Sequence, residues 1–100
     1  MFVIILSHHL CSRFMTYHGG KFYITDLGRD LIIILESEGQ GVKVFGGSGT
    51  GPGQFWDPAG LAVDDLGNML VADSRNHRLQ LIGQDRKWIR NVKVIILILI

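Results

Sequence analysis

The chain has 100 residues, of which 47% are hydrophobic and 19% are charged, and its formal net charge is +1. This length allows one small domain at most, the apolar content excludes intrinsic disorder, and the balanced charge gives no support for a strongly basic nucleic-acid-binding protein. A single cysteine, Cys11, excludes an internal disulfide framework or a multi-cysteine zinc module within these residues.

Both ends of the chain are strongly apolar, unlike the middle. The N-terminal run at 1–6 is shorter than a secretory signal and has no basic residue before it, so we expect no signal peptide. The C-terminal run at 93–100 is too short for a membrane-spanning helix, which needs about 20 apolar residues. Its β-branched residues favour either a buried edge strand or sequence foreign to the parent domain, as in a truncated gene.

The middle of the chain contains an internal repeat with a period of 47 residues. The segment GKFYITD at 20–26 aligns with GNMLVAD at 67–73, so that Asp26 falls opposite Asp73. A repeat of this length is typical of β-propellers and solenoids, in which each unit buries its faces against its neighbours.

Each unit of the repeat is predicted to consist of short β-strands, because apolar and β-branched runs alternate with turn residues. In chain order, we expect strands at 22–25, 31–35 and 42–45 in the first unit, and at 60–64, 69–72, 78–82 and 88–92 in the second. The residues at 1–18 supply no convincing inner strand for the first unit. Four antiparallel strands in about 40–50 residues is the pattern of a propeller blade.

The second unit resembles an NHL repeat. The residues that carry the resemblance are GQFWDPAGLAVD at 53–64, GNMLVAD at 67–73 and NHRLQL at 76–81. The glycine-rich run at 45–55 is similar to the flexible connection between two blades, and the nearest family is the metazoan TRIM-NHL proteins.

This resemblance implies an all-β fold, namely part of a six-bladed β-propeller with about two four-stranded antiparallel blades. We expect a poorly assigned apolar segment at 1–18, a divergent blade with its interblade loop at 19–52, an NHL blade at 53–92 and the apolar run at 93–100. A closed ring would require neighbouring blades beyond these two.

One face of the predicted blades carries the candidate binding residues. In an antiparallel blade, the connection that enters the first strand lies at the same end as the loop between the second and third strands. That end would display Arg29, Trp56, Arg75, Asn76 and His77. Arginine and aromatic side chains stack on unpaired bases, and asparagine hydrogen-bonds to base edges. The resemblance implies binding of single-stranded or hairpin RNA in post-transcriptional control, or binding of a protein partner, in the cytoplasm and away from membranes.

The same face also has a purely structural interpretation. Asp73, Asn76 and Arg78 recur in this type of repeat and are suited to hydrogen bonds within the blade, while Trp56 is suited to packing beneath the interblade loop. Arg75 and His77, the other two candidates in this loop, fit either a binding role or a structural one. Residues 18–90 carry eight Lys and Arg against nine Asp and Glu, so their charge does not favour RNA.

Patterns for catalysis are not found in the sequence. The glycine-rich run at 46–53 fits neither a P-loop nor a dinucleotide-binding motif, and His8, His9 and Cys11 lack a second ligand pair at zinc spacing. We therefore expect no catalytic residues, no metal and no cofactor. In TRIM-NHL proteins, ubiquitin-ligase activity needs a RING domain, which these residues lack. A lyase- or lactonase-type propeller enzyme is the rival class, but the inner strand near 59–62 offers none of the expected metal ligands.

Overall fold

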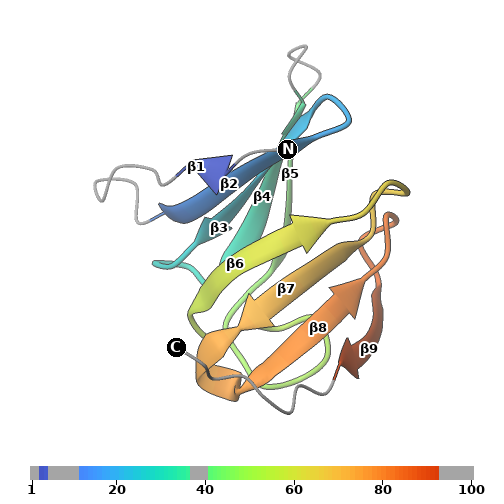
Figure 1. Ribbon diagram of the computed structural model, residues 1–100. Coiled ribbons are helices and arrows are strands. Elements are labelled where there is room, and N and C mark those ends of the chain that lie inside the picture. The colour runs from blue at the N-terminus through green and yellow to red at the C-terminus, as the bar shows by residue number, and fades with distance from the viewer. Residues whose placement is uncertain (1–2, 5–11, 37–40, 93–100) are drawn as a thin grey trace.

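The structure is a computed structural model that describes residues 3–4, 12–36 and 41–92. These residues form two antiparallel sheets that lie against each other, with β6 in contact with β2 and β3 (Figure 1). The first sheet comprises β1 (Val3–Ile4), β2 (Ser12–His18), β3 (Lys21–Asp26), β4 (Leu31–Glu36) and β5 (Val42–Gly46). The second comprises β6 (Pro58–Val63), β7 (Met69–Asp73), β8 (Arg78–Ile82) and β9 (Trp88–Val92).

Strands that follow each other in the sequence are hydrogen-bonded neighbours in both sheets, which is the meander of a propeller blade. All of the strands expected from the sequence are present, and their ends differ by no more than one or two residues from those predicted. The predicted all-β fold with two adjacent antiparallel blades is therefore confirmed. The described residues include no helix that could span a lipid bilayer. The C-terminal run at 93–100 lies outside them.

The inner strand of the first blade differs from the prediction. Residues 12–18 form β2, which pairs with β3 so that Met15 lies opposite Ile24 and Tyr17 opposite Phe22. The two strands are joined by Gly19 and Gly20, whose φ angles of 60° and 82° allow the tight turn that a two-residue hairpin needs. A pair of glycines between two β-prone runs is a hairpin signal, and the expected start of the blade at residue 19 is too late.

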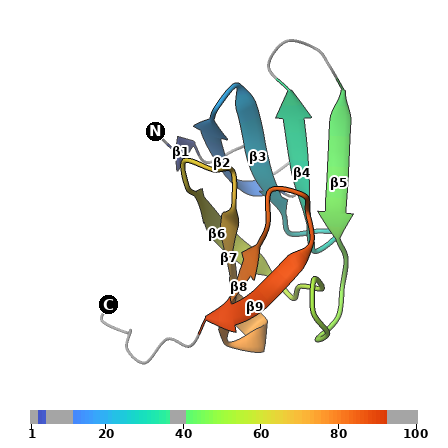
Figure 2. The same cartoon turned by 90° about the vertical axis from the view of Figure 1, so that its right-hand side faces the viewer.

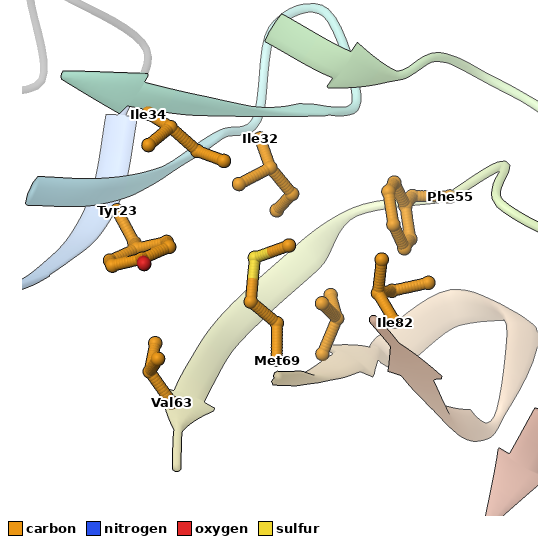
Figure 3. Packing of buried hydrophobic residues seen from close by; sticks show 8 residues of the cluster. Tyr23, Ile32, Ile34, Phe55, Val63, Met69 and Ile82 are labelled. Atoms are coloured by element: carbon orange, nitrogen blue, oxygen red, sulfur yellow. The ribbon is translucent and has the colours of Figure 1, made fainter. Parts of the chain in front are cut away.

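The hydrophobic core lies between the two sheets. Its buried side chains come from both blades and from the connection between them: Tyr23, Ile32, Ile34, Phe55, Val63, Met69, Val71 and Ile82 (Figure 3). Burying an aliphatic or aromatic side chain of this size contributes about 1.5–3 kcal/mol. The two blades thus stabilise each other by packing their apolar faces together.

Phe55 anchors the interblade connection to this core. Its side chain is fully buried, and its ring lies 5.6 Å from that of Phe45. Gly46 allows this packing, because a Cβ atom at that position would lie 2.7 Å from the Phe55 ring. The φ angle of Gly46 is 108°, which side chains rarely tolerate.

Replacing Phe55 by alanine should therefore lower the free energy of unfolding by about 3–5 kcal/mol, because it leaves a cavity between the blades. The matched control is Leu66→Ala, whose side chain is 71% exposed and whose loss should cost less than about 0.5 kcal/mol. Urea unfolding followed by circular dichroism measures both. Equal stabilities of the two variants would contradict the role given to Phe55.

Candidate functional site

The loops at 27–30, 47–57 and 74–77 lie at the same end of the two sheets, and we call the surface that they form the loop face. This placement follows from the meander, because β3, β5 and β7 end there and β4, β6 and β8 begin there. Figure 2 shows the connection from β5 to β6 beside the turn between β7 and β8. All five candidate residues are on these loops: Arg29, Trp56, Arg75, Asn76 and His77.

The buried carboxylate of Asp73, at the end of β7, is the centre of the second blade's loops. Its side chain has no exposed surface. One oxygen, Oδ1, accepts a hydrogen bond from the backbone N–H of Trp56 at 2.7 Å. The other, Oδ2, accepts from Arg78 Nε at 2.7 Å and from Gln80 Nε2 at 3.0 Å. Such pairing is what a buried charge requires, since an unpaired one would be strongly destabilising.

Arg78 and Gln80 extend this network to the glycine-rich connection. The guanidinium of Arg78 donates to the carbonyl oxygens of Thr50, Gly51 and Gln54 at 2.9–3.0 Å. Gln80 Nε2 also donates to Gln54 O, and Gln80 Oε1 accepts from the N–H of Gly53. The connection was expected to be a flexible link, but side chains of β8 fix its backbone.

Asn76 belongs to the same network. Its Nδ2 donates to Asp73 Oδ2 and to the carbonyl oxygen of Gly49, both at 2.9 Å. The amide nitrogen of this candidate binding residue is therefore engaged within the blade and is not available to a ligand. Asp73, Asn76 and Arg78 thus hydrogen-bond to one another within the blade, as their structural interpretation predicts.

The first blade carries a simpler version of the network. Asp26, which aligns with Asp73 in the repeat, is 2% exposed and accepts from the N–H of Gly28 and of Arg29. Arg29, the counterpart of Asn76, pairs with Asp26 through its guanidinium at 2.7–2.9 Å while its side chain remains 68% exposed. Leu31 and Ile33 stand in the positions of Arg78 and Gln80.

Trp56 and Arg75 form an exposed pair at the centre of the loop face. The Arg75 guanidinium lies 5.7 Å from the centroid of the Trp56 ring, in cation–π geometry, and 3.5 Å from Asp57 Oδ2. Trp56 is 49% exposed, so the expectation that it packs beneath the loop is wrong. Its neighbour Phe55 takes that buried place, while the backbone bond to Asp73 turns Trp56 outward.

Asp30 and Asp57 connect the two blades beneath this pair. Asp30 Oδ1 accepts from the N–H of Asp57 at 2.9 Å, and its Oδ2 accepts from the Ser48 hydroxyl at 2.7 Å. Ser74 Oγ donates to the carbonyl oxygen of Asp57. These two aspartates were not singled out from the sequence, although Asp30 aligns with His77 in the repeat. Asp30 and His77 share left-handed backbone, with φ angles of 55° and 54°.

His77 is exposed and ends the short 3-10 helix Ser74–Asn76. Its backbone N–H donates to Ser74 O at 3.2 Å, whereas its ring makes no side-chain hydrogen bond with other described residues. A shallow pocket opens beside Trp56, lined by Asp30, Ser48, Gly49, Thr50, Phe55 and Trp56. The loop face therefore combines an exposed imidazole, an indole–guanidinium pair and a shallow pocket.

The described ranges contain no group of three or more His, Cys, Asp and Glu side chains placed to hold a metal ion. His8, His9 and Cys11, considered above as metal ligands, lie outside these ranges.

Comparison with known proteins bears on the same residues. The sequence profile of the NHL repeat matches residues 55–80, from the anchor Phe55 to the buried Gln80. Over these residues the chain is similar to an NHL repeat. The match includes Asp73 and its partners Trp56, Asn76, Arg78 and Gln80, whereas the glycine-rich connection that they hold lies mostly before it.

Similar segments occur in three animal proteins of the TRIM-NHL family. The B-box type zinc finger protein ncl-1 of Caenorhabditis elegans is 41% identical over 44 residues, which is 44% of this chain and 5% of that protein. Protein brain tumor of Drosophila melanogaster is 39% identical over 44 residues, and protein lin-41 of Caenorhabditis elegans is 38% identical over 48. These two matches cover 44% and 48% of this chain and 4% of each relative. The matched part of the chain thus corresponds to a small part of each relative's length.

Replacing Arg78 by alanine should lower the free energy of unfolding by about 3–5 kcal/mol, because it leaves the buried Asp73 charge short of a partner. The matched variant is Arg29→Ala, which removes the arginine that pairs with Asp26. It should cost less than about 1 kcal/mol, since Arg29 is mostly exposed and backbone N–H groups still satisfy Asp26. Urea titration of both variants checks the difference, and similar losses would contradict the distinction between the blades.

Proposed function

We propose that the loop face is a recognition surface for single-stranded or hairpin RNA and that this module acts in post-transcriptional regulation. The NHL repeat and its similarity to TRIM-NHL proteins support a non-catalytic propeller module. A ubiquitin-ligase activity would belong to other parts of a longer protein. Control of messenger RNA after export from the nucleus makes the cytoplasm the proposed location.

The observation that carries the proposal is the exposed pair of Trp56 and Arg75. Indole rings and guanidinium groups are the side chains on which unpaired bases stack, at about 1–3 kcal/mol per base. Below this pair, hydrogen bonds to Asp73 and Asp30 fix the backbone at residues 56 and 57. A stacking platform held in this way loses little conformational freedom when a base binds.

Charge on the loop face shapes the kind of RNA binding that we propose. Arg75 is paired with Asp57 and Arg29 with Asp26, so neither arginine presents an uncompensated charge to phosphates. Because the salt dependence of nucleic-acid binding follows the number of phosphates neutralised, affinity at this face should fall only slightly as salt rises. Stacking, rather than phosphate contact, would supply most of the binding energy.

A protein partner is the second candidate. Tryptophan and arginine are the side chains most often found at the energetic centres of protein interfaces. The balanced charge of the loop face favours this alternative more than it favours RNA. In that case the propeller would recruit a protein, for instance a substrate of a RING-type ubiquitin ligase in the parent protein.

Charge reversal at Arg75 should weaken binding of a single-stranded RNA of about ten nucleotides at least about tenfold, because it removes a stacking and hydrogen-bonding group. Trp56→Ala should weaken it about five- to 150-fold, which corresponds to the loss of one stacked base. Fluorescence anisotropy at low salt measures the affinity. The control is Arg90→Glu, which makes the same charge change at an exposed position of β9.

Equal affinity of the Arg75→Glu and Arg90→Glu variants would reject Arg75 as an RNA contact. If the unaltered protein binds no RNA at low salt, the proposal fails in favour of a protein partner.

A further inference from the structure

A second hollow lies at the opposite end of the strands from the loop face, and we call it the turn-side pocket. It lies between the two blades, because both contribute to it: the β2–β3 turn and the ends of β4 and β5 from one, and the β6–β7 and β8–β9 turns from the other. Its volume is about 210 Å³, so it is smaller than a typical drug-sized site and would hold only a small ligand or the end of a larger one.

The floor of the turn-side pocket is formed by core residues. Tyr23, Ile34 and Met69 are 5%, 5% and 1% exposed, and all three line the pocket. In Figure 3, Tyr23 and Ile34 lie at one end of the core, whereas Phe55, which lines the loop-face pocket, lies at the other. The two hollows are therefore separated by the hydrophobic core.

The hydroxyl of Tyr23 is a polar group without a partner at this floor. The described residues provide no hydrogen bond to it, and no fully buried side-chain polar atom among them lacks one. The hydroxyl is therefore not fully buried, and Tyr23 lines the pocket. Burial and the nearby Glu36 carboxylate raise the pKa of Tyr23, so at neutral pH the hydroxyl is protonated and able to donate.

The rim of the pocket has an excess of positive charge. Lys21 pairs with Glu36 at 3.7 Å, whereas Lys43 and Arg86 have no acidic partner within 4.0 Å among the described residues. Asp65 is the remaining acidic group of the rim, and His18 also lines the pocket. With His18 neutral, the formal charges of the rim sum to +1.

We propose that the turn-side pocket binds a carboxylate carried on an apolar body. The carboxylate would accept a hydrogen bond from the Tyr23 hydroxyl and pair with Lys43 and Arg86, and the apolar body would lie against Leu66, the exposed apolar residue of the lining. Two sources supply this chemistry: a free carboxylic acid, or the C-terminus of a peptide that ends in an apolar residue. The site is independent of the loop face and of any role in binding RNA.

The probe for the free acid is 3-phenylpropionate, and 3-phenylpropanol is its neutral counterpart with the same apolar body. A short acetylated peptide ending in phenylalanine, with either a free or an amidated C-terminus, tests the second source. Binding to the full chain is followed by NMR through the methyl group of Met69. We expect shifts with at least one free carboxylate, and binding at least about tenfold weaker for its neutral or amidated counterpart.

Tyr23→Phe, which removes only the hydroxyl, and Lys43→Gln should each weaken carboxylate binding about tenfold. Lys43 is exposed, so its variant preserves the core even if Tyr23→Phe perturbs it. The control is Lys87→Gln, which loses the same charge at an exposed residue outside the pocket and should leave binding unchanged.

Three results would overturn the proposal: no shift with either free carboxylate, equal binding of the neutral probes, or equal affinities of the Lys43→Gln and Lys87→Gln variants. Shifts with the free acid alone identify a small molecule as the ligand, and shifts with the peptide identify a chain terminus.

Discussion

A single buried carboxylate determines how the loops of the second blade are arranged. Asp73 has no exposed surface, and its two oxygens accept from Trp56, Asn76, Arg78 and Gln80. Because removing a carboxylate from water is costly, burial alone would favour an apolar residue here. The buried carboxylate instead fixes the geometry of the loops, because a charge with these hydrogen-bond partners permits only one arrangement of three chain segments. Trp56 is turned outward as a result, while Phe55 enters the core.

Comparison of the two blades shows what the network adds. The first blade keeps the buried aspartate, Asp26, but its partners are two backbone N–H groups and the exposed Arg29. With Leu31 and Ile33 in place of Arg78 and Gln80, β4 has no side chain that reaches an interblade connection through hydrogen bonds. The second blade therefore holds in place the connection that precedes it. This connection carries Trp56, the exposed indole of the loop face.

Local sequence pattern was sufficient for the strands but not for the contacts between distant segments. Apolar runs between turn residues predict β3 to β9 closely, whereas for β2 the local signal is the Gly19–Gly20 hairpin that follows it. Which of the adjacent aromatics Phe55 and Trp56 is buried depends on a hydrogen bond to a residue 17 positions away. The bonds from Arg78 to the connection span 24–28 positions, and no periodicity reports such pairs.

Amide hydrogen exchange at Trp56 tests the central role of Asp73 most directly, because the Trp56 N–H donates to that carboxylate. In the Asp73→Ala variant, which removes both acceptor oxygens, exchange at Trp56 and Gly53 should be at least about tenfold faster than in the unaltered protein, while amides of β3 keep their protection. Asp26→Ala should leave both loop amides unchanged. Unchanged protection of Trp56 in Asp73→Ala would contradict the central role of Asp73, since the connection would then be held by other contacts.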